Sequence, residues 1–116
     1  MQSPLSEGEL AELEVTLLPA LERHHLRLLA HGLRTLQTIA GRREGALPPL
    51  AMIEAWILAQ PATAGDLPFA RAFASQLQAA GDQLLAIAKP CGVSPLALEL
   101  SELTTWAQAQ AEARLR

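Results

Sequence analysis

LLPALERHHLRLLAHGLRTLQTIAG, residues 17–41, is the longest stretch of this chain in which apolar residues recur with a helical period. At about 100° per residue, the apolar residues between positions 20 and 40 occupy an arc of roughly 160° on a helical wheel. One neighbouring helix covers less than that, so we expect a long helix that packs against at least two others. The arc consists of Leu21, His25, Leu26, Leu28, Leu29, Gly32, Leu33, Leu36, Ile39 and Ala40.

Gly32 lies inside this apolar arc. Glycine in the interior of a helix costs about 1 kcal/mol of helix propensity relative to alanine, so a glycine there needs a structural reason. We predict that the backbone of another helix approaches closely at Gly32.

The opposite side of the predicted helix is basic. Residues 23–43 hold five Arg and no acidic residue, whereas residues 1–22 hold five Glu and no Lys or Arg. The two segments can neutralise each other across a helix hairpin, or the basic face can bind an acidic protein partner. The candidate partner-binding residues on this face are Arg23, His24, Arg27, His31 and Arg34.

Composition favours an all-α fold made largely of leucine and alanine. The chain has 23 Leu and 22 Ala among 116 residues, and β-branched residues, which favour strands, are scarce. This length suits one domain with a single core. Only 18% of the residues are charged, against about 25% in typical soluble domains. A surface so poor in charge predicts self-association, most simply as a homodimer.

The helices are predicted over about 6–18, 19–40, 49–59, 67–88 and 95–114, forming a compact bundle of four to five helices. Residues 1–5 are expected to be loose, and residues 6–116 to form a single domain. Ser6 and Glu9 have the spacing of a capping box, and Pro19 separates the first two helices. Gly41 is placed to end the second helix, and Asp66 to cap the fourth.

The segment before the last helix allows two interpretations. Residues 89–94, KPCGVS, are typical of a tight loop, after which Ser94 can cap a helix and Pro95 can occupy its first position. Leu96, Leu98 and Leu100 also alternate with a period of two, so this turn can instead be extended, with the helix starting at Ser101. We favour the helical interpretation.

The residues that catalysis or metal binding would need are not arranged for it. His24 and His31 share a helix face but are separated by about 10.5 Å along the axis, too far to ligate one ion. Cys91 precedes a predicted helix N-terminus, which lowers a thiol pKa, but no histidine neighbours it to act as a base. We therefore predict no enzymatic activity, no metal and no cofactor.

A cytoplasmic location is expected, without a membrane span. The first residues lack the basic start and apolar run of a signal peptide, and one Cys fits a reducing compartment. The most apolar segment, Leu47–Ala59, contains Glu54 and is too short to span a bilayer.

These patterns favour a non-enzymatic helical protein-interaction module: an adaptor, assembly or regulatory factor with an unidentified protein partner. One alternative is a nucleic-acid-associated regulator that uses the Arg23–Arg43 face, which the net charge of -3 disfavours. A second alternative is a small-ligand-binding protein with a pocket between leucine-rich helices. The residues proposed for self-association are Leu77, Ala80, Leu84 and Trp106.

Overall fold

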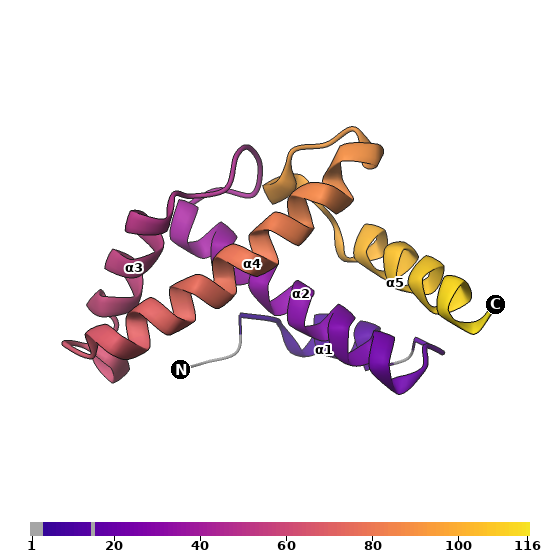
Figure 1. Ribbon diagram of the computed structural model, residues 1–116, viewed down its shortest axis with the longest axis horizontal. Helices are drawn as coiled ribbons and strands as arrows, with labels where there is room; N and C mark the ends of the chain where they lie inside the picture. Colours follow the sequence, from indigo (N-terminus) through magenta and orange to yellow (C-terminus); the bar gives the residue numbers. More distant parts are fainter. Residues whose placement is uncertain (1–3, 15) are drawn as a thin grey trace.

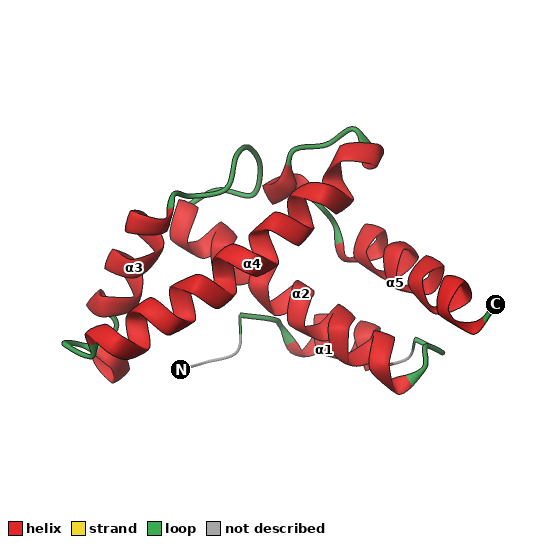
Figure 2. Cartoon of the chain, in the orientation of Figure 1, coloured by secondary structure: helices red, strands yellow, loops and turns green. Residues whose placement is uncertain are grey.

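The computed structural model describes residues 4–14 and 16–116, which form helices and loops without strands (Figure 2). The predicted all-α bundle is confirmed. The α-helices are α1 (Glu7–Glu14), α2 (Ala20–Ala40), α3 (Leu50–Ala59), α4 (Leu67–Cys91) and α5 (Leu100–Leu115). Two short 3-10 turns, η1 (Pro61–Thr63) and η2 (Pro95–Ala97), precede α4 and α5.

Helix α2 is the centre of the fold and contacts each of the other four helices. Helix α4 crosses it, α3 packs beside the first half of α4, and α5 packs on α2 at the other end of the molecule (Figure 1). The prediction that this helix touches at least two others is therefore confirmed.

Helices α2 and α4 cross where Gly32 faces Ala80. A Cβ atom added to Gly32 would lie only 3.2 Å from the Ala80 Cβ, so the predicted close approach is confirmed. The next residue of α4, Gly81, makes room for a loop side chain, since a Cβ atom there would lie 3.1 Å from Leu47 Cδ1. Small residues on both helices thus let the two longest helices meet at short range.

The core forms around this crossing from leucine and isoleucine side chains of every helix. The largest side chains with almost no exposed surface are Leu13, Leu26, Leu33, Leu36, Ile53, Ile57, Leu84, Leu96, Leu98 and Leu103. Leu5, in the segment expected to be loose, is also buried, whereas residues 1–3 lie outside the described part of the chain.

The predicted helix ends are largely found where the sequence indicated them. The Ser6 and Glu9 side chains each accept a hydrogen bond from the other residue's N–H, at 3.1 and 3.2 Å, as in a capping box. Asp66 Oδ1 accepts from the N–H of Phe69 at 3.1 Å. Gly41, with φ of 71°, ends α2 in a left-handed conformation that suits glycine.

The first helix is shorter than the predicted range of 6–18, since α1 ends at Glu14. Thr16 hydrogen-bonds the Leu13 carbonyl through both its N–H (3.3 Å) and its hydroxyl (2.7 Å), which closes the last turn. Residue 15 lies outside the described residues. The predicted separation of the first two helices is present, because α2 begins only after Pro19.

The fourth helix is longer than predicted: it passes through Pro90 and ends at Cys91 instead of Ala88. Proline lies here in the last turn, and the end is closed beyond it by Gly92, whose φ is 70°. The Gly92 N–H donates to Lys89 O and the Val93 N–H to Ala88 O, the paired bonds of a Schellman motif.

The favoured helical start at residue 95 is wrong in part. Residues 95–97 form a single 3-10 turn, Leu98 and Glu99 are not helical, and α5 begins at Leu100, close to the alternative start at Ser101. Ser94 does not cap a helix with its side chain. Its hydroxyl instead accepts a hydrogen bond from the Gly45 N–H, at 2.8 Å, and joins two loops.

Replacing Gly32 by leucine tests the crossing. We expect Gly32→Leu to lower the free energy of unfolding by about 1–3 kcal/mol, because the new side chain has to displace α4 at Ala80. Thr38→Leu, at an exposed position of the same helix, should change it by no more than about 0.5 kcal/mol. Urea unfolding followed by circular dichroism measures both. Equal effects of the two substitutions would contradict the proposed role of Gly32.

Candidate functional site

The basic face of α2 is largely neutralised by α1. Arg34 Nη2 lies 2.6 Å from Glu9 Oε2, and Arg27 Nη2 lies 2.6 Å from Glu14 Oε1. This is the intramolecular pairing that the charge distribution allowed. Of the five candidate partner-binding residues, only Arg23, His24 and His31 form no ion pair within the described ranges.

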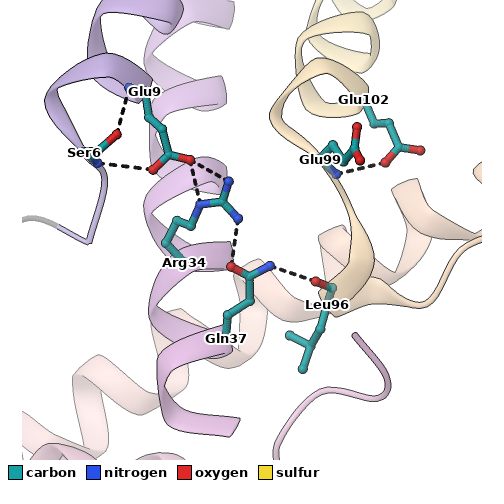
Figure 3. A network of polar contacts seen from close by, with 7 residues as sticks. All are labelled: Ser6, Glu9, Arg34, Gln37, Leu96, Glu99 and Glu102. Carbon is teal, nitrogen blue, oxygen red and sulfur yellow. Dashed lines mark hydrogen bonds and ion pairs between the residues drawn. The ribbon is translucent and has the colours of Figure 1, made fainter. Parts of the chain in front are cut away.

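Arg34 also belongs to a polar network that joins α1, α2 and η2 (Figure 3). Its Nη1 donates to Gln37 Oε1 at 2.8 Å, and Gln37 Nε2 donates to the Leu96 carbonyl at 2.8 Å. Gln37 is buried, so water cannot reach its side-chain amide, and these two hydrogen bonds supply the partners that the amide needs. The Arg34 guanidinium, through its hydrogen bonds, holds the pKa of Glu9 below its ordinary value. The network is therefore structural and fixes α1 on α2.

A second ion pair holds the end of α5 against the start of α2. Arg114 reaches both oxygens of Glu22, at 2.5 and 3.0 Å. The carboxylate is buried, and the hydrogen bond from Arg114 lowers the pKa of Glu22 despite its burial. Sequence reasoning missed this pair, because 92 residues separate its members.

A first apolar hollow, of about 420 Å³, lies between α2 and α4. Leu28 is 54% exposed here, although the helical wheel placed it in the buried arc. Leu21, one turn before His25, is likewise 60% exposed. Most of the lining is apolar or uncharged: His25, Leu28, Leu29, His31, Gly32, Thr35, Phe73, Gln76, Leu77, Ala79, Ala80 and Gln83.

A second apolar hollow, of about 540 Å³, lies between the last turns of α4 and helix α5. Its lining continues the side of α4 that borders the first hollow, since residues 76, 80, 83, 87 and 90 recur at helical spacing. Its residues are Ala86, Ile87, Pro90, Cys91, Ser101, Glu102, Thr105, Trp106 and Ala109.

The two hollows follow one another along α4, and their linings touch. The ring of His25, from the first, meets the ring of Trp106, from the second, edge to face at a centroid distance of 5.6 Å. We call the combined surface, lined by the residues named for the two hollows, the α4 groove. Neither lining contains Lys, Arg or Asp. The groove is thus a long, nearly uncharged surface suited to an apolar segment.

The residues predicted for self-association divide between groove and core. Leu77 and Ala80 line the first hollow and Trp106 lines the second, whereas Leu84 is fully buried in the core. Leu84 therefore offers no surface to a partner of the folded chain. Sequence reasoning missed Leu28 and His25 as groove residues. The signal that could have identified them was the width of the apolar arc of α2, because α4 and α5 cover this arc only in part.

Cys91 lies in the groove as the last residue of α4, not ahead of a helix N-terminus as the sequence suggested. Desolvation and the neighbouring Glu102 carboxylate raise the pKa of its thiol. A raised pKa disfavours the thiolate that nucleophilic catalysis requires. Within residues 4–14 and 16–116, no three His, Cys, Asp or Glu side chains are grouped as a metal site.

None of the helices in the described part of the chain is long and apolar enough to cross a membrane.

A family model described as NDH complex assembly factor CRR9 matches residues 5–114 of this chain, nearly its whole length. No curated protein and no solved structure matches significantly.

The Glu9–Arg34 pair makes stability depend on pH. Because the folded chain lowers the pKa of Glu9 below 4.5, the pair contributes stability above that pH and loses it as the pH falls through the folded pKa. We expect Glu9→Gln to lower the free energy of unfolding at pH 7 by up to about 1 kcal/mol. The difference from the wild type should shrink as the pH falls below 4.5 and passes through the lowered pKa of Glu9.

Urea unfolding at several pH values measures this difference. Glu12→Gln is the matched control, since Glu12 is exposed on the same helix and has no ion-pair partner in the described ranges. An effect of Glu9→Gln that does not change with pH would show that the ion pair is not its cause.

Proposed function

We propose that this chain, which belongs to the NDH complex assembly factor CRR9 family, acts without catalysis as an assembly factor that binds a protein component of an NDH complex. The family supports the assembly role, and the α4 groove is the observation that supports a binding site. The groove is a hollowed surface with a mostly apolar lining, in which Leu28 is 54% exposed.

The length of the groove suits a segment of protein better than a small molecule. Its α4 wall runs from Phe73 to Cys91, which at 1.5 Å per residue is roughly 27 Å. Small-molecule sites bury most of their ligand in one cleft, whereas this surface is shallow and elongated. Grooves of this form between helices bind the apolar side of a partner helix.

The basic face of α2 is the weaker candidate for a partner surface. Arg27 and Arg34 already pair with Glu14 and Glu9, so an acidic protein or a nucleic acid would have to displace α1 to reach these two. Within the described ranges, Arg23, Arg42 and Arg43 form no ion pair. The nucleic-acid alternative thus has three of the five arginines of this face for phosphate contacts, and the net charge of -3 counts against it.

Self-association is a separate proposal, supported by the low charge fraction and by exposed apolar side chains outside the groove, such as Met52 and Leu85. Light scattering of the purified chain tests the predicted homodimer. A cytoplasmic location likewise stays a prediction, which fluorescence microscopy of a tagged chain tests.

A charge placed on the edge of the groove tests the binding site. Ala79 is exposed and lines the first hollow, whereas Ser75 is exposed on α4 outside the groove. We expect Ala79→Arg to weaken the binding of NDH complex components at least about tenfold, about 1.4 kcal/mol, because an arginine would be buried against an apolar partner. Ser75→Arg adds the same charge and should keep the wild-type affinity.

The measurement is co-purification with each variant from cells that assemble an NDH complex, after circular dichroism has confirmed that both variants fold. Equal recovery of the components with both variants would refute the groove as the binding site.

A further inference from the structure

We infer that the segment held in the α4 groove is an α-helix of about four to five turns, with an uncharged apolar face and a Lys or Arg at the end that lies beside Glu102. This inference rests on the proposed function and adds the chemistry and direction of the bound segment.

The small residues of the groove favour a helix as occupant. Ala80 lies near its centre, and Ala79, Ala86 and Ala109, which are exposed, lie along its walls. Small side chains let a helix backbone approach to the 8–10 Å separation of packed helices. A helix also satisfies its own backbone hydrogen bonds, which an extended chain could not do on a surface with so few polar groups.

The charge of the groove is uneven along its length. Glu102, in the second hollow, is the one carboxylate in either lining. No cation in the described ranges forms an ion pair with it. The last turn of α4 and the first turn of α5 both lie in this hollow, so their helix dipoles oppose each other and the Glu102 carboxylate sets the charge there. This end therefore favours a cation on the bound helix.

The opposite end carries no acidic group. The polar residues of the first hollow are two histidines, two glutamines and a threonine. A basic residue there would find no carboxylate, so a single cation on the bound helix sets which way it runs. The surface between the two ends, including the contact of His25 with Trp106, offers apolar area without charge.

A second copy of this chain fits the groove poorly. Its most apolar helix, α3, carries Glu54 as its single charge, which Glu102 would repel. Helix α3 also lies at the opposite end of the molecule from α5 (Figure 1). Inserting α3 of one copy into the groove of another would give a head-to-tail contact, which forms open chains unless its rotation closes into a ring.

Trp106 provides a direct readout of groove occupancy, since it lines the second hollow and is half-buried. In a Trp56→Phe background it is the remaining tryptophan of the chain. The probes are two designed helical peptides of about 18 residues with the same leucine and alanine face. One carries Lys near one end of that face, and the other carries Glu in the same position.

We expect the Lys peptide to shift Trp106 fluorescence and to bind at least about tenfold more tightly than the Glu peptide. Glu102→Lys should reverse that preference, and Ala79→Arg should abolish binding of both peptides. Glu102 Oε1 also accepts a hydrogen bond from the Glu99 N–H at 2.9 Å, so Glu102→Gln is the variant that keeps this cap of α5. It should bind the two peptides equally, which would show an intact groove without the charge preference.

Three results would overturn the inference, and they are distinguishable from one another. Equal affinities for the two peptides, both lost in Ala79→Arg, would remove the charge preference but leave the groove as a binding site. Binding that survives in Ala79→Arg would place the peptides elsewhere and would remove support for the proposed function as well. A stable dimer in solution that Ala79→Arg dissociates would show that a second copy occupies the groove, which overturns the inference too.

Discussion

The close approach of α2 and α4 at Gly32 is the constraint on which the rest of the structure depends. With only a hydrogen at residue 32, Ala80 can sit against the α2 backbone and the two longest helices cross. Because they cross, their ends diverge and leave spaces that other elements fill unequally (Figure 1). Helix α3 fills the space beside the first half of α4, and α5 packs on α2. The groove is the side of α4 that borders α2 and α5 without being covered by them.

Charge and apolar surface therefore have different roles in this chain. Two of the three arginines of α2, Arg27 and Arg34, hold α1 through Glu14 and Glu9. Gln37, which is buried, extends the same network to η2 through its hydrogen bond to the Leu96 carbonyl. The surface that we propose for recognition is instead the nearly uncharged groove along α4, in a chain that belongs to an assembly factor family.

The sequence predicted the features that depend on local chemistry. The capping pair of Ser6 and Glu9, the caps at Gly41 and Asp66, and the close approach at Gly32 each follow from the conformational needs of those residues. The predicted ranges 19–40 and 49–59 agree with α2 and α3 to within one residue at each end, and the predicted start of the fourth helix at residue 67 is that of α4.

What the sequence could not predict depends on tertiary contacts. A helical wheel shows that Leu28 is apolar but not whether another helix covers it. Ser94 was a plausible cap, but a loop that lies 49 residues away in the sequence offers its hydroxyl a better donor, the Gly45 N–H. Pro90 would end many helices, yet the Schellman motif at Gly92 closes α4 beyond it. The groove is formed by α2, α4 and α5 together, and no single segment of the sequence indicates it.

Site-specific photo-crosslinking tests most directly whether the α4 groove binds a protein component of an NDH complex. Benzoylphenylalanine would replace Ala79 in the groove or Ser75 outside it, in cells that assemble an NDH complex. A crosslink from position 79 to a component of that complex, with none from position 75, is the predicted result. Crosslinks from position 75 alone, or from neither position while the chain still co-purifies with the complex, would contradict it.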